Sequence, residues 1–117
     1  PRPLLVYAHG TNTDRGYDLA DLRDADNGEG LAIAGVFASQ GWVVLAPNYA
    51  GYAGSPLPYH PYLVADQQSK DVLDALAAAR GAFATVRADV DARLYVTGYS
   101  QGGHVALAVQ RALQAAG

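Results

Sequence analysis

Three short runs of consecutive apolar residues, each leading into a loop or turn and then a helical segment, restrict most strongly how this chain can fold. The runs cover residues 4–8, 42–46 and 94–97. Continuous apolar runs of this length are typical of strands that are buried on both faces of a sheet. The segments that follow them predict helices over residues 28–40, 62–80 and 101–116. This alternation predicts an α/β fold in which a parallel sheet is the middle layer of a three-layer α/β/α arrangement.

The first two predicted helices have recognisable ends and apolar faces. Asn27 is suited to cap the first helix, and Gly41 is suited to end it. Apolar residues recur at helical spacing: Leu31, Ala34 and Phe37 in the first helix, and Val72, Leu76 and Ala79 in the second. We therefore expect these two faces to pack against the sheet.

The composition suits a packed core and excludes several kinds of protein. Half of the residues are hydrophobic and 16% are charged, which argues against disorder. The net charge is −3 and the basic residues form no stripe, so we expect no nucleic-acid partner. Because the chain has no cysteine, it has no disulfide, thiolate metal site or cysteine nucleophile. Its apolar runs are too short to span a bilayer, so no integral membrane segment is expected.

The segment Gly98-Tyr99-Ser100-Gln101-Gly102 matches the pattern G-x-S-x-G and lies between a predicted strand and a predicted helix. In that context a sharp turn holds the serine in a strained conformation and exposes its hydroxyl. Gly98 and Gly102 let the strand and helix approach closely, and Gly103 removes a further side chain. The helix N-terminus favours negative charge, and the backbone N–H of Gln101 is placed to bind an oxyanion. We therefore predict that Ser100 is a catalytic nucleophile.

The main alternative for residues 98–103 is a phosphate-binding loop or a plain tight turn. Glycine is frequent in this chain, so a chance match to the pattern is a real risk. The segment lacks both G-x-G-x-x-G and G-x-x-x-x-G-K, the two common phosphate-binding patterns. The order of strand, turn and helix favours the nucleophile.

A second candidate segment, His9-Gly10-Thr11, follows the first apolar run directly. A tetrahedral intermediate needs two hydrogen-bond donors, and one of them often comes from a backbone N–H in such a loop. We predict that Thr11 supplies this N–H, that Gly10 lets the backbone approach the substrate, and that His9 shapes the loop. The alternative is that His9-Gly10 is only a polar end of the strand. We predict that residues 4–8 lie between the other two strands, so that both segments meet at a switch point, where ligands bind.

The other polar and aromatic residues have simpler explanations. We expect His104 to pack beneath the turn and His60, which precedes Pro61, to be a structural loop residue. The aspartates at 66, 71 and 74 are expected on a solvated helix face, and those between residues 14 and 26 lack the spacing of a calcium loop, so no metal site is predicted. Two roles stay open, lining an acyl pocket or packing under a loop, for Tyr49, Tyr52, Tyr59 and Tyr62.

Together these segments resemble an α/β-hydrolase of the bacterial lipase and esterase kind, near the secretory lipases. The resemblance rests on Tyr7-Ala8-His9-Gly10-Thr11, Pro47-Asn48-Tyr49-Ala50-Gly51-Tyr52, His60-Pro61-Tyr62-Leu63 and Gly98-Tyr99-Ser100-Gln101-Gly102-Gly103-His104. It implies that residues 1–117 are one partial α/β-hydrolase domain whose strands correspond to the third, fourth and fifth of the family. It also implies hydrolysis of a small-molecule or lipid carboxylic ester through an acyl-enzyme, without a cofactor, in a secreted or periplasmic protein.

One feature departs from the family pattern, in which the triad acid and histidine follow the serine. The 17 residues after Ser100 include no Asp or Glu. We therefore expect the acid and histidine to lie beyond residue 117 of a longer protein, and this piece alone to be nearly inactive. A serine peptidase or thioesterase on the same fold would share these features. A catalytically dead binding module would lack the downstream acid and histidine.

Overall fold

The computed structural model describes residues 1–117 and contains three strands, three α-helices and one 3-10 helix. The strands are β1 (Arg2–Ala8), β2 (Val43–Leu45) and β3 (Val90–Gly98). The helices are α1 (Gly28–Val36), α2 (Ala65–Ala82) and α3 (Gln101–Ala115), and the 3-10 helix η1 (Ala38–Gln40) follows α1. None of these helices is long and apolar enough to cross a membrane.

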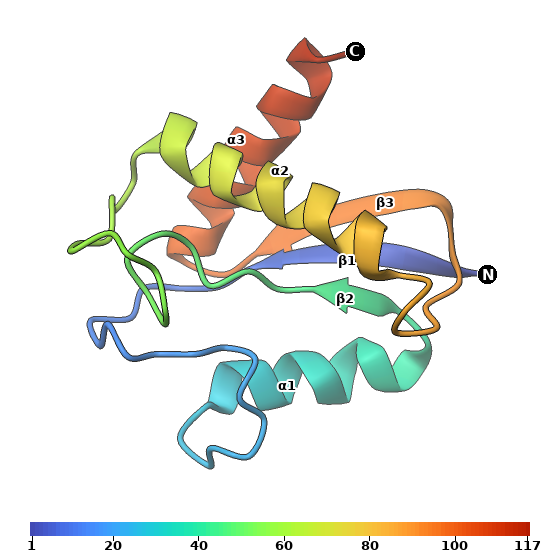
Figure 1. The fold of residues 1–117 in the computed structure, drawn as a ribbon, viewed down its shortest axis with the longest axis horizontal. Coiled ribbons are helices and arrows are strands. Elements are labelled where there is room, and N and C mark those ends of the chain that lie inside the picture. Colours follow the sequence, from blue (N-terminus) through green and yellow to red (C-terminus); the bar gives the residue numbers. More distant parts are fainter.

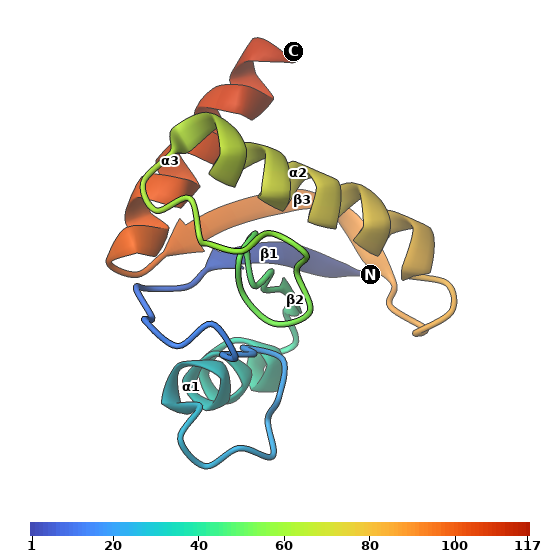
Figure 2. The same cartoon turned by 60° about the vertical axis from the view of Figure 1, so that its left-hand side comes forward.

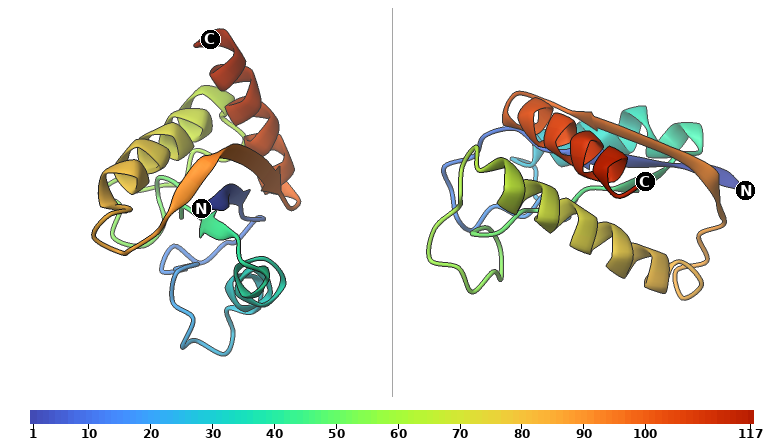
Figure 3. Two further views of the ribbon diagram at one scale, coloured as in Figure 1. Left: turned by 90° about the vertical axis from the view of Figure 1, so that its right-hand side faces the viewer. Right: turned by 90° about the horizontal axis from the view of Figure 1, so that it is seen from above.

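The three strands form one parallel sheet in the order β2-β1-β3. Helices α2 and α3 cover one face of this sheet, and α1 covers the other (Figures 1 and 3). The predicted α/β class, the three layers and the strand order are therefore confirmed.

The central strand β1 holds the core, because helices cover both of its faces. Its residues from Leu4 to Ala8 are all buried. Beneath α2 and α3 the buried core residues are Leu4, Val6, Ala8, Tyr49, Tyr52, Val72, Leu76, Val105 and Val109. A smaller cluster beneath α1 joins Tyr7 to Leu19 and Ile33. The apolar face predicted for the second helix is the one that packs against the sheet.

Several element boundaries differ from the prediction. The first helix ends at Val36 and tightens into η1 before Gly41, which takes a φ of 90°. Helix α2 begins at Ala65 instead of residue 62, because Leu63 has a φ of 58° and a right-handed helix cannot include it. Strand β3 begins earlier, at Val90, where it pairs with Arg2.

The buried face of α1 was predicted only in part. Phe37 packs against the cluster beneath α1, but Leu31 is 42% exposed, and the buried residues of the helix are Gly30 and Ile33. A Cβ on Gly30 would lie 2.6 Å from the carbonyl oxygen of Leu19, so the absence of a side chain allows the loop to approach the helix here. Because α1 carries apolar residues on most sides, spacing alone could not identify this face.

All three strands end at the same edge of the sheet. The chain leaves β1 into a loop that reaches α1, leaves β2 into a loop that reaches α2, and leaves β3 into a tight turn before α3 (Figure 2). In an open parallel sheet, ligands bind at this carboxyl edge, between strands whose connections run to opposite faces. Strands β1 and β3 form such a pair, since the connection after β1 leads to α1 and that after β3 leads to α3.

Candidate active site

The turn between β3 and α3 holds Ser100 in an unusual backbone conformation, with φ 55° and ψ −116°. The prediction of a positive φ is therefore confirmed. For a residue other than glycine such a conformation costs on the order of 1–3 kcal/mol and persists only where the surroundings hold it. Here the Tyr99 N–H donates to the Ala8 carbonyl at 3.1 Å, and the Gly102 N–H donates to the Tyr99 carbonyl at 2.8 Å. The turn is thus tied to the end of β1 and to itself, and Ser100 remains exposed.

Two of the three glycines around Ser100 are required by close backbone contacts. A Cβ on Gly98 would lie 2.0 Å from the carbonyl oxygen of Gly102, and a Cβ on Gly102 would lie 1.8 Å from that of Ala8. No side chain fits at either position. By contrast, a Cβ on Gly103 would meet nothing within 4 Å, so a small side chain would fit at this position.

The loop after β1 lies directly against this turn. A Cβ on Gly10 would lie 2.9 Å from Cδ1 of Tyr99, so glycine lets the loop pack against Tyr99; the approach of Gly10 to the substrate stays a prediction. The Gly10 N–H donates to Oε1 of Glu29 at 2.8 Å, and the Tyr7 hydroxyl donates to the same oxygen at 2.8 Å. The backbone N–H groups of Thr11 and Gln101 have no hydrogen-bond partner in the protein. Both are therefore available to a ligand; their distances to the Ser100 hydroxyl stay a prediction.

His9 is completely buried and joins the first loop to the second. Its Nδ1 lies 2.7 Å from the Gly10 carbonyl oxygen, and its Nε2 lies 2.8 Å from that of Asn48. Its ring stacks on Tyr49 at a centroid distance of 4.1 Å, and the Tyr49 hydroxyl donates to the His9 carbonyl at 2.8 Å. His9 therefore ties the first loop to the second and has no contact with solvent.

His60, in the second loop, is held in the same way. Its Nδ1 lies 2.8 Å from the Ala50 carbonyl oxygen, and its Nε2 lies 2.6 Å from Oε1 of Gln101. The same Gln101 oxygen accepts a hydrogen bond from Nε2 of Gln68 at 2.6 Å. Since both ring nitrogens are engaged, the expected structural role of His60 agrees with its contacts.

Side chains that the sequence analysis did not single out hold both loops. Besides Glu29, these include Asn48, whose Oδ1 accepts the Leu19 N–H at 2.8 Å and whose Nδ2 donates to Asp18 at 2.9 Å. Asp71 accepts the Ala50 N–H at 3.0 Å, so it is not part of a purely solvated helix face as predicted. Asn48 had a usable signature, because it is a polar residue just beyond the end of a buried strand.

The aspartates of the first loop stabilise its turns. Side-chain oxygens at positions 14, 18, 21 and 24 each accept the backbone N–H two residues further on, at distances from 2.9 to 3.1 Å. These contacts are Asx-turns, in which a short acidic side chain replaces a backbone acceptor. The acidic composition of the loop is thus explained by its backbone geometry.

His104 does not pack beneath the turn as predicted; it is exposed. The buried positions of α3 are Gln101, Val105 and Val109, spaced four residues apart, together with Gly102. His104 borders this stripe and faces away from the sheet, because successive helix residues are rotated by about 100°.

The tyrosines divide into a buried and an exposed group. Burial is the main reason why the pKa values of Tyr7 and Tyr49 lie above the ordinary range, and the Glu29 carboxylate adds to both shifts. Burial and the same carboxylate raise the pKa of Tyr17 to about 12. Tyr59 and Tyr62 are 61% and 50% exposed. The buried tyrosines therefore pack under the loops, and the exposed Tyr59 and Tyr62 line the pocket between the loops, which the buried Tyr52 also borders.

A pocket of about 500 Å³ opens between the two loops at the carboxyl edge of the sheet. Its nine lining residues include Thr11, Arg15, Tyr59 and Tyr62, and none is Leu, Ile, Val or Met. The Thr11 Oγ1 and the Tyr62 hydroxyl oxygen are 3.0 Å apart, which joins the loops across the pocket. Ring faces and polar groups therefore bound this pocket instead of aliphatic side chains.

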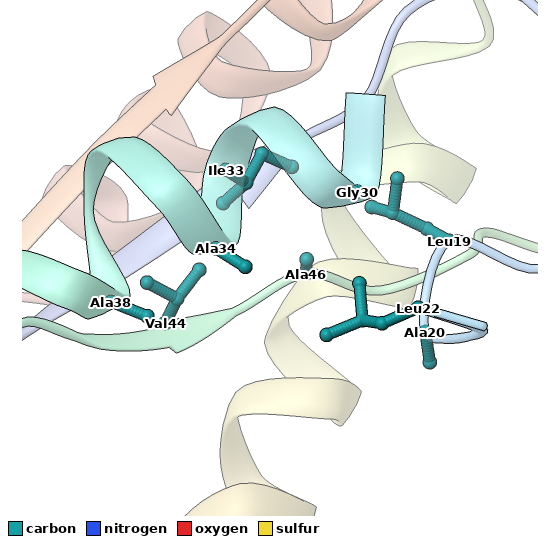
Figure 4. Close-up of a pocket in the computed structure, with 9 residues that line it drawn as sticks. All are labelled: Leu19, Ala20, Leu22, Gly30, Ile33, Ala34, Ala38, Val44 and Ala46. Atoms are coloured by element: carbon teal, nitrogen blue, oxygen red, sulfur yellow. The ribbon is translucent and has the colours of Figure 1, made fainter. Parts of the chain in front are cut away.

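A second cavity, of about 250 Å³, lies between α1, the first loop and β2 (Figure 4). Eight of its nine lining residues are hydrophobic, and none can ionise. It offers no group for chemistry, so the pocket between the loops is the one that belongs to the candidate site.

Comparisons with known proteins agree with this arrangement. The model of the secretory lipase family matches residues 27–116. The rice cell wall degrading esterase LipA from Xanthomonas oryzae has a TM-score of 0.90 and 36% sequence identity, over 98% of this chain and 30% of that one. A protein from Legionella pneumophila has a TM-score of 0.85 and 26% identity, over 97% of this chain and 30% of that one. A search of curated proteins found no match.

The chain thus spans about 30% of the length of these two solved structures. Its three parallel strands and flanking helices form part of the α/β-hydrolase fold that the LipA match identifies. The family model covers more than three quarters of the chain, including all of α2, β3 and the turn at Ser100. The chain therefore belongs to the secretory lipase family.

Proposed function

We propose that the protein is a serine hydrolase of carboxylic esters and that Ser100 is its nucleophile. The observation that carries the proposal is the backbone of Ser100, an exposed residue with a φ of 55° in the turn from β3 to α3. Strained residues of this kind cluster at active sites. Membership of the secretory lipase family supports the same reaction class, and LipA, which this chain resembles at 36% identity, is an esterase.

The proposed reaction begins when Oγ of Ser100 bonds to the ester carbonyl carbon and the carbonyl π pair moves onto its oxygen. The hydroxyl proton passes to a histidine acting as general base. The oxyanion accepts hydrogen bonds from the backbone N–H groups of Thr11 and Gln101, which no protein group occupies. Collapse expels the alcohol, which takes up the proton and leaves an acyl group on Ser100. Water, activated by the same base, then releases the acid.

In this proposal residues 1–117 are one part of the hydrolase domain and supply its third, fourth and fifth strands. The triad acid and histidine lie outside these residues. His9 and His60 support this division, since both ring nitrogens of each lie within hydrogen-bond distance of other protein groups. His104 lies on the exposed side of α3.

The pocket between the loops is proposed to accept the part of the substrate next to the ester. Thr11 lines this pocket and also carries the first oxyanion donor, so a group held there is adjacent to the reacting carbonyl. The substrate class is a small-molecule or lipid ester.

The test uses the full-length protein and a short-chain p-nitrophenyl ester. We expect a burst of p-nitrophenolate followed by steady turnover, because an acyl-enzyme forms and is then hydrolysed. Ser100→Ala should lower kcat by on the order of a million-fold, as when one member of a complete triad is removed. Ser39→Ala, in the exposed helix η1, is the matched control and should leave kcat unchanged. Unchanged hydrolysis in Ser100→Ala would refute the nucleophile.

Two further measurements separate this proposal from its alternatives. Comparing an ester, a thioester and an anilide with the same acyl group distinguishes an esterase from a thioesterase or peptidase. Residues 1–117 alone should show little turnover; full activity there would make His60 the first candidate for the base. Binding of an ester without any turnover by the full-length protein would identify a catalytically dead binding module.

A further inference from the structure

A polar cluster lies at the contact between α2 and α3, two helices that lie on the same face of the sheet (Figure 3). Its members are Gln68, Gln101 and His60, here called the glutamine–histidine cluster. Gln68 and Gln101 are only 0% and 3% exposed. Nε2 of Gln68 and Nε2 of His60 both lie 2.6 Å from Oε1 of Gln101.

Stability does not explain this cluster. Oε1 of Gln68 and Nε2 of Gln101 are buried and have no hydrogen-bond partner. Unpaired polar atoms in a core are costly, and an incompletely paired polar cluster is less stable than apolar side chains of the same size. Exceptions of this kind call for an explanation in terms of function.

The cluster holds Gln101 whichever charge His60 carries. His60 Nδ1 faces the Ala50 carbonyl at 2.8 Å, so a neutral ring that donates there has an unprotonated Nε2. The Gln101 amide then donates to this nitrogen after a half-turn, and the Gln68 amide turns as well, so that its oxygen accepts from Gln101; when the ring is charged, the Gln101 oxygen accepts from both partners. In both states His60 of the second loop and Gln68 of α2 hold the Gln101 side chain by hydrogen bonds.

Gln101, whose side chain the cluster holds, is the residue that directly follows Ser100. Gln101 is the first residue of α3, and its backbone N–H is free of any protein partner. The direction of this N–H depends on the peptide between Ser100 and Gln101, and that peptide joins a strained residue with ψ −116° to the helix. Contacts of Gly98 and Gly102 hold the turn from the side of the strands. The cluster holds it from the side of α2 and the second loop.

We propose that Gln68 and His60 are positioning residues for the oxyanion donor: by clamping the Gln101 side chain, they aim the Gln101 backbone N–H. The proposal rests on the function proposed above for Ser100. Neither residue touches the substrate carbonyl in it; both act through Gln101. Loss of the clamp should therefore weaken binding of the oxyanion and leave binding of the ester unchanged.

The experiment measures kcat, KM and thermal unfolding of full-length Gln68→Met, which keeps side-chain length and removes the hydrogen bonds. We expect kcat to fall on the order of 10- to 100-fold, which is part of the roughly 100- to 1,000-fold cost of losing a whole oxyanion donor. KM should stay within about twofold. The inhibition constant of a trifluoromethyl ketone, which forms a tetrahedral adduct with serine, should rise by the same factor as kcat falls.

The matched control is Gln67→Met, the same change one residue earlier in α2. It removes the Gln67 hydrogen bond to Asp71, 2.7 Å long, and does not touch the cluster. Its kcat should stay within about twofold, since only Gln68→Met releases Gln101. Equal kcat in the two variants would overturn the positioning role.

Two further variants keep the test decisive. His60→Phe retains the ring packing on Tyr52, whose centroid is 4.6 Å away, and removes both nitrogens. It should lower kcat and the affinity for the trifluoromethyl ketone by the same factor even if Gln68→Met does not fold; because His60 also lines the pocket between the loops, its KM is not part of this test. The double variant Gln68→Met/Gln101→Met should be no slower than Gln101→Met alone, because both changes break one clamp; multiplied losses would refute the clamp.

Ser100→Ala, measured alongside, tests the proposed function separately. Activity that survives Ser100→Ala overturns the nucleophile, and the positioning role with it. Activity that is lost in Ser100→Ala and fully kept in Gln68→Met and His60→Phe overturns the positioning role alone.

Discussion

The strained turn at Ser100 is flanked by Gly98 and Gly102, whose lack of a side chain leaves room for neighbouring backbone atoms. Gly98 touches the backbone of Gly102, and Gly102 touches the carbonyl of Ala8 at the end of β1. A Cβ at either position would clash, so glycine lets the turn lie this close to the end of β1. The backbone strain, of about 1–3 kcal/mol, is thus offset by packing between the turn and the central strand.

Substituting these glycines by alanine should separate the required positions from the free one. Gly102→Ala places a Cβ 1.8 Å from a carbonyl oxygen, so the free energy of unfolding should fall by about 3 kcal/mol or more. Gly103→Ala has open space in the first turn of α3 and should raise it by up to about 1 kcal/mol, since alanine is the better helix residue. Urea unfolding of both variants measures the difference. Similar losses in the two would contradict the contact at Gly102.

Helix α1 serves the site through its N-terminus. Asn27 caps the helix by accepting the Gly30 N–H at 3.0 Å, and its amide also donates to the Leu19 carbonyl at 2.9 Å. In the first turn, Glu29 accepts the Gly10 N–H and the Tyr7 hydroxyl. The helix thereby fixes the start of the loop that carries Thr11, although it lies on the face of the sheet opposite α3 (Figure 1).

We expect Glu29→Met to lower the free energy of unfolding by about 1–3 kcal/mol, because two buried donors then lose their acceptor. Asp66→Ala is the control: it also removes an acidic residue from a first turn, that of α2, but the side chain has no hydrogen bond to lose. The control reports the interaction with the helix dipole alone, which is worth about 0.3–1 kcal/mol. Equal losses in chemical denaturation would show that Glu29 acts only through the helix dipole.

Across the molecule, the tyrosines packed around the two loops make stability depend on alkaline pH. Burial raises the pKa of Tyr17 to about 12, and the pKa values of Tyr7 and Tyr49 are raised too. In the unfolded chain a tyrosine ionises near pH 10, so the unfolded state loses its protons first. The stabilisation is therefore complete below roughly pH 10 and is lost as the pH rises towards about 12.

The corresponding prediction is a fall in the urea midpoint above roughly pH 10, accompanied by the ultraviolet absorbance of tyrosinate. Tyr17→Phe should make this fall shallower, because one raised phenol is removed. Tyr95→Phe, in the exposed edge strand β3, should leave the slope as it is. An unaltered slope in Tyr17→Phe would show that this residue does not contribute.

Much of the architecture could be predicted because it depends on local patterns. Continuous apolar runs identify β1, β2 and β3, and the strand order follows from bringing the Ser100 turn and the Thr11 loop to one edge. Helix boundaries were less predictable where one residue overrides the periodicity, as Leu63 does with its φ of 58°. The buried face of α1 was predicted only in part for a related reason, since the helix carries apolar residues on most sides.

The sequence by itself determined the class of fold and the two glycines that the turn at Ser100 requires, because each is written in adjacent or regularly spaced residues. The order of strands needed the added argument that two separate loops meet at one edge of the sheet. The partners of Gly10 and Gln101 are of another kind. Glu29 is 19 residues from Gly10, while Gln68 and His60 are 33 and 41 residues from Gln101. These contacts exist only after both loops and α2 have folded onto the carboxyl edge of the sheet. No spacing encodes them, because they depend on where separate segments meet in space.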